Sequence, residues 1–242
     1  AKDRMTMQTR ILKKLGWNVY NLWTINYFNN QKREINKIKE VVATLTEKKV
    51  VSKKTVRDAL QKYRKTYKTA YIKPLARAGA EYVLNFVNEE AIMNKIRTVI
   101  EVESPIEESC LIDKIAAAFC VPKTAKKAIA QTSRYVSSYE AQRQEYSGKV
   151  FYVDKPVSTF RPSDARVTRD LTKVHPHEIV AAAKCAIEAT VYIEKDDLNK
   201  EVFKLFNVEK RTNPAVEWGD ACLTAAVQTG EIIVPPDGFC RV

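Results

Sequence analysis

The chain has 242 residues, of which 45% are hydrophobic, 29% are charged and only six are glycine. This composition is typical of an ordered, helix-rich protein and excludes a low-complexity or fibrous chain, and the length predicts one large domain or two to three small ones. No apolar run approaches the ~18 residues that cross a bilayer, so we expect a cytoplasmic protein with no membrane partner.

The charge is unevenly distributed along the chain. Residues 1–90 hold 20 of the 41 Lys and Arg residues but only 8 of the 29 Asp and Glu residues, so the remainder is balanced. A concentrated basic field attracts polyanions and gains affinity by releasing their counterions. The sequence therefore favours nucleic acid as a partner. A solvated helix surface, or a face that docks on an acidic neighbouring domain, is the alternative interpretation.

The first predicted elements are a helix, a strand and a second helix. Apolar residues at four-residue spacing predict a helix over 3–15, and Gly16 ends it. Alternating residues over 17–23 predict a strand, and an apolar stripe over 35–45 predicts a longer amphipathic helix. Because these three elements cannot complete a sheet domain, we expect the sequence to begin partway through a fold.

The stretch "KDRMTMQTRILKKLGWNVYNLWTINYFNN" resembles the last part of the very-short-patch-repair-type endonuclease fold. In that fold a helix leads into a strand of the form GW-x-V-x-x-x-W and then an aromatic pair. The matching residues here are Gly16, Trp17, Val19, Trp23, Tyr27 and Phe28. The resemblance implies that residues 1–45 are the C-terminal remnant of a nuclease-like α/β fold. Since the family's catalytic residues lie upstream of this part, it assigns no nuclease residue to this chain.

Residues 46–88 are predicted to form a basic helical connector. Within its densest run, "EKKVVSKKTVRDALQKYRKTYK", the residues Val56, Leu60, Tyr63 and Tyr67 recur at helical spacing and leave the cations on other faces. The candidate nucleic-acid contacts here are Lys53, Lys54, Arg57 and Lys65. The tyrosines, with Tyr71, are suited to stacking on bases, although such a stripe more often serves packing.

Two stretches of the chain repeat the same apolar pattern at an offset of 87 positions. The matched pairs are Ile92 with Ile179, Ile100 with Ile187, Ile106 with Ile193, Leu111 with Leu198, Ile115 with Val202, Phe119 with Phe206 and Val121 with Val208. Shared helical periodicity alone is the alternative explanation. The turns and helix-breaking residues between the predicted helices also agree in the two stretches, which favours a repeated unit.

Each copy is predicted to contain three helices. The first helices cover about 90–102 and 177–189, and a short extended piece separates them from second helices at 107–119 and 195–206. A turn leads to third helices, which start near Thr124 in copy one and at a cap of Asn213 followed by Pro214 in copy two. "SPIE" from Ser104 is alternatively a capping box that starts the second helix directly.

β-rich segments are predicted after both third helices, at "SGKVFYVD" from Ser147 and "GEIIVPPDGF" from Gly230. Three helices followed by a β ribbon is the winged-helix plan. We therefore expect a mainly α chain with small β ribbons (α+β), in which winged-helix-like domains cover residues 89–160 and 172–242.

The third helix of copy one carries the main candidate site. Ala125, Ala128, Ile129, Thr132 and Val136 form its expected inner stripe. The outer candidates are Lys123, Lys126, Lys127, Gln131 and Arg134. Lysine and arginine suit phosphates or guanine edges, and glutamine suits adenine, so this pattern predicts a helix that contacts DNA in the major groove.

The third helix of copy two has a different outer face. Its aligned positions are Lys210, Pro214, Trp218 and Ala221, with Glu217 and Asp220 beside them. The acids would repel phosphate, and Trp218 is predicted to mark a protein interface. A protein-interaction or intramolecular docking scaffold is therefore the alternative function.

Residues from about 88 to 235 resemble the uncharacterised C-terminal domain of large bacterial superfamily I helicase-like proteins. The resemblance is carried by "NEEAIMNKIRTVIEVESPIEESCLIDKIAAAFCV" and "FYVDKPVSTFRPSDARVTRDLTKVHPHEIVAAA", including the spacing of Glu101, Pro105, Ile106 and Leu111. The turn "FCVPKTAKKA" departs from the Gly- and Arg-rich turn of that family, so no ligand contact is assigned. The resemblance implies an ATP-driven, DNA-associated parent with upstream motor and nuclease domains as partners, and duplex or junction DNA as ligand.

No pattern in the sequence predicts catalysis. The five cysteines lie far apart and read as small buried residues, and His175 and His177 flank Pro176 as in a loop that starts a helix. None of the glycines belongs to a phosphate-binding GxxxxGK loop. We therefore expect a non-enzymatic chain without a cofactor, a metal or a small-molecule substrate.

Overall fold

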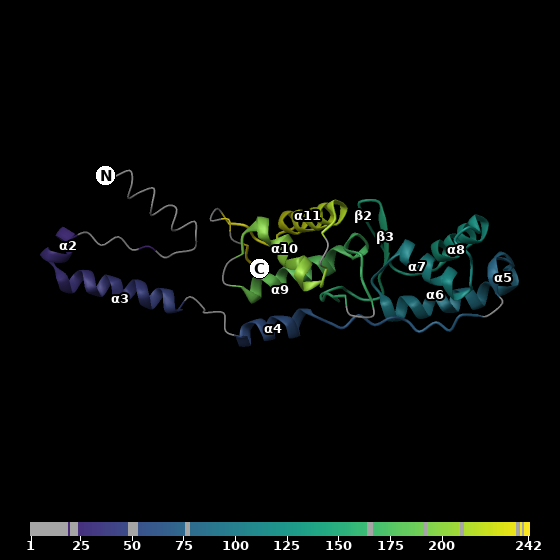
Figure 1. The fold of residues 1–242 in the computed structure, drawn as a ribbon, viewed down its shortest axis with the longest axis horizontal. Coiled ribbons are helices and arrows are strands. Elements are labelled where there is room, and N and C mark those ends of the chain that lie inside the picture. Colours follow the sequence, from purple (N-terminus) through teal and green to yellow (C-terminus); the bar gives the residue numbers. More distant parts are fainter. Residues whose placement is uncertain are drawn as a thin grey trace. The chain divides into compact units, whose positions relative to one another are not determined.

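A computed structural model describes residues 19, 24–47, 53–75, 78–163, 167–190, 193–208, 211–235, 238 and 240–242. The chain divides into two compact units, Ala1–Val50 and Val51–Val242 (Figure 1). The predicted helix over 3–15 and, apart from Val19, the predicted strand over 17–23 lie outside the described residues.

The described part of the first unit is a pair of helices, α2 (Thr24–Asn29) and α3 (Gln31–Glu47). Asn30 separates them, and its side-chain oxygen accepts a hydrogen bond from the backbone N–H of Arg33 (3.1 Å), as an N-cap does. The carboxylate of Glu34 is buried and pairs with Lys37 one turn later (2.7 Å). The amphipathic helix predicted over 35–45 is thus present.

The second unit is mainly helical and contains one small sheet. Its elements, in chain order, are α4 (Lys53–Tyr63), α5 (Gly79–Leu84), the 3-10 turn η1 (Phe86–Asn88), α6 (Glu89–Glu103), β1 (Ile106–Glu107), α7 (Glu108–Ala118), α8 (Lys126–Ser138), β2 (Arg143–Tyr146), β3 (Lys149–Tyr152), the 3-10 turn η2 (Leu171–Lys173), α9 (Pro176–Ala189), α10 (Lys195–Leu205) and α11 (Asn213–Gln228). The predicted mainly α chain with a small β component is confirmed.

The three strands form an antiparallel sheet in the order β1-β3-β2. β2 and β3 make a tight hairpin whose two turn residues, Ser147 and Gly148, both have positive φ (49° and 76°), as a two-residue hairpin turn requires. On the other side of β3, Tyr152 pairs with Ile106 of β1. The sheet thus joins the start of α7 to the hairpin.

Two apolar cores lie on either side of this sheet. One is formed by α5 to α8 and includes Tyr152, and the other is formed by α4 and α9 to α11 and includes Phe151. Adjacent residues of one strand point to opposite faces, so β3 contributes one aromatic ring to each core. The hairpin therefore belongs to both halves of the second unit.

The helices of the two predicted copies recur at the predicted offset. α7 and α10 have bounds that differ by 87 at both ends, and α8 and α11 begin 87 positions apart. The turn after the second helix also recurs, because Cys120 and Asn207 both adopt positive φ (53° and 55°). Just before these two residues, Phe119 and Phe206 are both fully buried.

The predicted starts of two helices need correction. Thr212 is the N-cap residue before α11, and Asn213 is its first helical residue. Glu107, and not Ser104, occupies the N-cap position of α7, where its carboxylate accepts a hydrogen bond from the N–H of Cys110 (3.2 Å). An extended piece, β1, therefore precedes the second helix, and the alternative capping box is wrong.

The connector is helical over only part of its predicted length. Residues 64–75 run extended from α4 to the end of α7, where the N–H of Leu75 bonds to the carbonyl of Ala118 (2.9 Å). Tyr67 therefore shares no helical face with Tyr63. Its hydroxyl donates to the buried carboxylate of Glu103 (2.5 Å), and this tertiary bond replaces the expected helical stripe.

The second predicted ribbon is smaller than expected in the described residues. There, the segment after Gly230 forms a single antiparallel bridge between Ile233 and Arg241. The N–H of Cys240 also bonds to the carbonyl of Ile193 (2.9 Å), so the C-terminal segment pairs with the extended piece before α10.

Candidate nucleic-acid interface

The outer face of α8 presents the predicted polar residues to solvent. Lys126, Lys127 and Arg134 are exposed on the helix, and Lys123 is exposed in the turn before it. Gln131 lies between them and is half-buried, and its side-chain oxygen accepts a long hydrogen bond from Arg134 (3.5 Å). The structure thus brings all five predicted residues of this copy together on one helix and its preceding turn.

The inner face of α8 explains why the outer residues are held in place. Ala128, Thr132 and Val136 are buried at four-residue spacing, as predicted, and Tyr135 is buried beside them. The backbone carbonyl of Val136 also accepts a hydrogen bond from the hydroxyl of Tyr152 on β3 (2.9 Å). A helix fixed by its core and by the sheet presents its opposite face to a ligand at little conformational cost.

The N-terminal end of α8 has a positive electrostatic character. Its N-cap residue, Ala125, offers no side-chain acceptor, and the first turn contains no acidic residue. Within the described part of the chain, Lys123, Lys126 and Lys127 form no ion pair. The helix dipole and the three ammonium groups therefore act in the same direction, and this arrangement favours phosphate.

The hairpin β2–β3 is not free in the way a DNA-contacting wing would be. Its Tyr146 ring packs edge-on against the His175 ring, with 5.2 Å between the centroids. The ammonium group of Lys149 lies 3.9 Å above the ring of Trp218 and also donates to the carbonyl of Thr172. The hairpin thus docks on α9 and α11 of the same chain.

Trp218, which the sequence predicts to mark a protein interface, is buried within its own chain. The residue is only 7% exposed, and its indole N–H donates to the carbonyl of Val174 (3.1 Å). Its ring stacks on Phe151 of the hairpin at 6.3 Å. Trp218 does pack against protein, but the surface that it binds belongs to its own chain.

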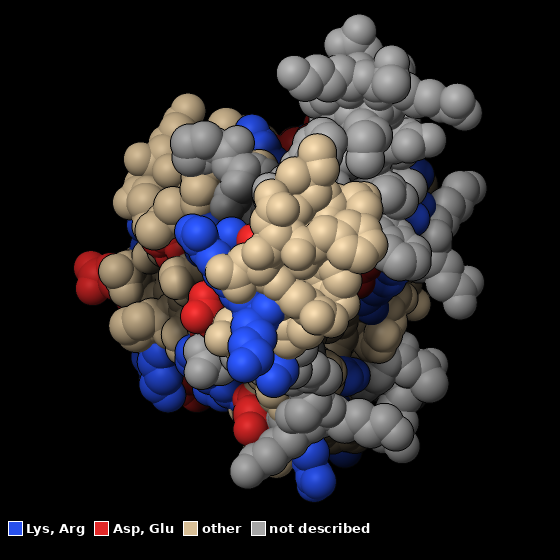
Figure 2. All heavy atoms as spheres, turned by 90° about the vertical axis from the view of Figure 1, so that its left-hand side faces the viewer, with Lys and Arg blue, Asp and Glu red and all other residues tan. Residues whose placement is uncertain are grey.

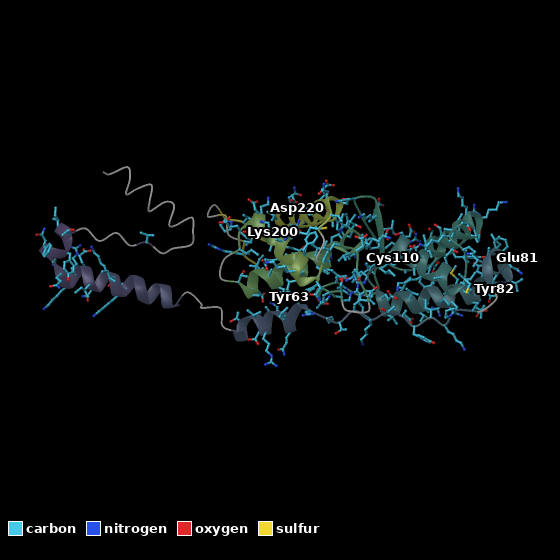
Figure 3. All side chains as sticks on the ribbon, in the orientation of Figure 1. Tyr63, Glu81, Tyr82, Cys110, Lys200 and Asp220 are labelled. Carbon is cyan, nitrogen blue, oxygen red and sulfur yellow. The ribbon has the colours of Figure 1, made fainter. Side chains whose placement is uncertain are left out.

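The other residues at the outer face of α11 agree with the prediction of a surface unsuited to phosphate. Pro214, Glu217, Asp220 and Ala221 are exposed, and the aligned residue Lys210 lies outside the described residues. Asp220, labelled in Figure 3, accepts a hydrogen bond from the side chain of Asn199 on α10 (2.7 Å). This face carries acidic groups where α8 carries basic ones.

A second group of predicted residues lies on α4 and just after its C-terminal end. Arg57 and Lys65 are exposed and line an open groove together with Arg64, whereas the side chains of Lys53 and Lys54 lie outside the described part. The inner residue Tyr63, labelled in Figure 3, lies between α4 and α9, and its hydroxyl donates to Glu188 (2.8 Å). The structure places this group on a different element from the α8 group.

Figure 2 views the molecule from one side, where basic side chains are more widespread than acidic ones among the described residues. This distribution agrees with the excess of Lys and Arg in the first 90 residues. It does not by itself select a binding site, because exposed cations also serve solubility.

The sequence reasoning missed a buried ionic cluster at the junction of the two halves. The guanidinium of Arg161 donates to the carbonyls of Glu103, Ser104 and Pro105 (2.8–2.9 Å) and to the carboxylate of Glu178. Arg169 donates to the same carboxylate (2.6 Å). Each of these residues resembles an ordinary surface charge in the sequence, so no pattern could have paired them.

The ionised state of Glu178 is maintained by its partners. Burial raises the pKa of this carboxyl group, but the charges of Arg169 and Arg161 and their hydrogen bonds outweigh burial and hold the pKa below its ordinary value. The side-chain hydrogen bonds of Arg161 and Arg169 go to backbone carbonyls and to the carboxylate of Glu178. Its role is therefore to fix the two halves to each other, not to bind a ligand.

The histidines occupy the start of α9, as predicted. His175 is its N-cap, and the Nδ1 atom accepts a hydrogen bond from the N–H of His177 (3.2 Å) while Nε2 lies 3.0 Å from the side-chain oxygen of Gln144. Burial and the neighbouring His177 lower the pKa of His175 to about 4. His175 is thus neutral at physiological pH and serves as a structural contact between α9 and the hairpin.

The cysteines follow the prediction only in part. Cys185, Cys222 and Cys240 are buried, whereas Cys110 is half-buried and Cys120 is exposed in the turn after α7. Burial raises the pKa of Cys222 to about 12, so this thiol is protonated and weakly nucleophilic. The described residues include no cluster of three or more His, Cys, Asp or Glu that could hold a metal.

Among the described residues, no helix is both long and apolar enough to cross a bilayer. Comparison of the chain with protein families, with characterised proteins and with solved structures found no match.

Proposed function

We propose that the second unit is a nucleic-acid-binding module in which α8 enters the major groove of duplex DNA. The observation that carries the proposal is a set of cations at and before the N-terminal end of α8 that form no ion pair with any described residue, on a helix whose opposite face is fixed in a core. A recognition helix contacts base edges with its N-terminal residues, and phosphates bind well at a helix N-terminus.

The proposal includes a fold of two winged-helix-like modules at 89–160 and 172–242. The coinciding bounds of the helices, the shared left-handed turn residue and the strand order β1-β3-β2 support the winged-helix plan for the first module. In the second, the pairing of Cys240 with Ile193 and of Arg241 with Ile233 gives the C-terminal segment the same two neighbours that β3 has.

In this scheme only one of the two third helices is available to DNA. Gln131 and Arg134 of α8 correspond to Trp218 and Ala221 of α11 at the offset of 87. Trp218 is covered by the hairpin of the first module, whereas Arg134 is exposed. The first module thus uses its hairpin to cover the second, and the free helix is the basic one.

The proposed biological context is that of a larger protein. The resemblances in the sequence support a C-terminal module, without catalytic activity of its own, of a helicase-like and nuclease-like DNA-associated protein. On this proposal the upstream motor and nuclease domains are its partners, and it works in the cytoplasm without a cofactor. Residues 1–45 would be the end of the nuclease-like fold.

Binding of a labelled duplex, followed by fluorescence anisotropy at 50–200 mM salt, tests the function. The triple variant Lys123→Glu, Lys127→Glu and Arg134→Glu should bind at least about tenfold more weakly and with a shallower salt dependence, since each lost phosphate contact lowers the slope by about 0.9. The charge-matched control reverses Lys32, Lys200 and Lys204, three exposed lysines on α3 and α10. Equal binding by both triple variants would contradict the proposal.

A protein-interaction scaffold is the second candidate, and an exposed apolar corner favours it. Leu84, Phe86 and Val87 lie at the junction of α5 and η1 with 42%, 70% and 87% of their surface exposed. Gel filtration with light scattering tests it: a stable dimer that is lost on Phe86→Ser and Val87→Ser, without retardation of DNA at low salt, would support the scaffold and contradict DNA binding.

A further inference from the structure

The groove beside α4 has the composition of a phosphate-binding surface. Its polar lining consists of Arg57, Gln61, Arg64, Lys65 and Thr66, and its remaining lining residues, Val56 and Leu60, are apolar. No carboxylate lines the groove, and among the described residues its three cations form no ion pair. Three unpaired cations around a hollow of about 500 Å³ fit a phosphodiester backbone.

The groove is fixed to the rest of the second unit. α4 packs on α9, and its Ala59 and Tyr63 are buried in the second core. At the end of α4 the N–H of Lys65 bonds to the carbonyl of Phe160 (2.9 Å), and the N–H of Phe160 bonds to the carbonyl of Tyr63 (2.8 Å). The cations therefore belong to a rigid surface and not to a loose basic tail.

The neighbouring cation on the same helix, Lys62, differs from the groove cations because it forms an ion pair within the protein. Its ammonium group pairs with Glu188 of α9 (2.7 Å), so that charge is used to hold α4 in place. Arg57, Arg64 and Lys65 have no such partner in the described structure and remain available for an external anion.

The groove and α8 lie toward opposite ends of the second unit (Figure 1). The extended residues 64–75 connect the two regions, from the groove at Arg64 to the end of α7 at Leu75. Figure 1 shows this segment running from one region to the other without turning back, and twelve extended residues span about 40 Å, the length of about 12 base pairs of duplex DNA at about 3.4 Å each. A duplex much shorter than that can occupy only one of the two surfaces.

We infer that the α4 groove is a second phosphate-binding site and that the second unit bridges two segments of one duplex, with α8 at one segment and α4 at the other. This inference rests on the proposed function of α8. A ligand that engages both surfaces gains affinity through the high effective concentration of the second contact, whereas a short ligand does not. The chain should therefore discriminate by length.

The test compares duplexes of 8 and 24 base pairs with a common core sequence, measured by anisotropy at several salt concentrations. The double variant Arg64→Gln and Lys65→Gln removes two groove cations. Its matched control, Lys200→Gln and Lys204→Gln, removes the same charge from α10, where both lysines pair with neighbouring acids. Circular dichroism checks that all four exposed substitutions leave the fold intact.

On the 24-mer, the groove variant should bind at least about tenfold more weakly than the control, with a salt slope smaller by about 1.8 for two lost phosphates. On the 8-mer, it should stay within about threefold of the control. Binding equal to the control on both duplexes would overturn the inference. An equal loss on both lengths would also overturn it, because the groove would then be the main site and not the second one.

A third double variant, Lys127→Gln and Arg134→Gln, separates this inference from the proposed function. If it weakens binding to both duplexes while the groove variant has no effect, the function of α8 stands and the bridge fails. If it has no effect while the groove variant abolishes binding, the proposed function of α8 fails, and the bridge fails with it.

Discussion

The ammonium group of Lys149 lies 3.9 Å above the ring of Trp218, so a residue of the hairpin holds a residue of α11 by a cation–π contact. Phe151 of the same hairpin also stacks on the Trp218 ring, with 6.3 Å between the ring centroids. Through Lys149 and Phe151, the small sheet packs on the core that α4 and α9 to α11 form.

Replacing Trp218 with Ala should therefore lower the free energy of unfolding by about 3–5 kcal/mol, because a large ring is lost from two packed surfaces and a cavity is left. Urea unfolding followed by circular dichroism measures the change. Phe86→Ala is the control, since Phe86 is exposed and its loss should change stability by about 0.5 kcal/mol or less. Similar effects of the two substitutions would show that the hairpin contact is weak.

Arg161→Met should destabilise the chain by about 3–5 kcal/mol. The change removes the donor to the carbonyls of Glu103, Ser104 and Pro105 and leaves the buried Glu178 paired with Arg169 but no longer with residue 161. Lys62→Met is the matched control, because its ion pair with Glu188 lies at the surface and should contribute about 0–1 kcal/mol. If Arg161→Met cost no more than the control in urea unfolding, the buried cluster would not join the two halves.

Stability should fall as the pH is lowered from about 6.5 toward 4, because the folded state holds His175 neutral. Its pKa is about 4 in the fold against 6.5 in the unfolded chain, so between these values the unfolded state binds more protons. The loss at pH 4 amounts to up to about 3 kcal/mol, from ~1.4 kcal/mol per unit of pKa.

The groups in contact with the His175 ring are Tyr146, Phe151, His177 and Gln144. Burial has the largest effect on the pKa of His175, and of the nearby charges Glu178 raises this pKa and Arg161 lowers it. Glu178 contributes at lower pH, since its folded pKa is below the ordinary value and its stabilisation is lost only as pH falls below about 4.5. Urea unfolding of the wild type and of His175→Asn at pH 7.0, 6.0 and 5.0 isolates the histidine. A wild-type stability that is constant over this range would contradict the prediction.

Gly219→Ala should destabilise the packing of α10 on α11 by about 1–3 kcal/mol. A Cβ atom at this position would lie 2.3 Å from the side-chain oxygen of Asn199. This side chain is held in place because its amide nitrogen donates to the carbonyl of Val216 and to the carboxylate of Asp220. The double variant Gly219→Ala and Asn199→Ala provides space for the new methyl group. In a double-mutant cycle, Gly219→Ala should lower the free energy of unfolding less in the Asn199→Ala variant than in the wild type. Strict additivity of the two losses would exclude the steric explanation.

The sequence predicted the helices of the second unit because their apolar residues repeat with the helical period. The bounds of α6, α7, α9 and α10 lie within about two residues of the predicted ones. The same period placed Lys126, Lys127 and Arg134 on an exposed face, since that face is simply the complement of the buried one. The main candidate site could thus be found without a structure.

The sequence could not predict the extended course of residues 64–75 or the burial of Trp218 under the hairpin. Tyr67 and Tyr63 have helical spacing, but a buried carboxylate 36 residues later binds Tyr67, and this partner has no local signal. Trp218 lies at an outer position of the predicted third helix, where the sequence predicts contact with protein but not which surface makes it. The hairpin that covers it comes from about 70 residues earlier, and only tertiary packing shows the contact.

The extended residues 64–75 determine how the protein can be shortened. The carboxylate of Glu103 is fully buried, and it binds Tyr67 and the backbone of Ala70 as well as Lys114 (2.5, 2.9 and 2.9 Å). A fragment that starts at residue 89 would keep Lys114 but would lose both other donors. Crystallisation or binding fragments cut at that apparent domain boundary should therefore be poorly soluble, and useful truncations should start upstream of α4.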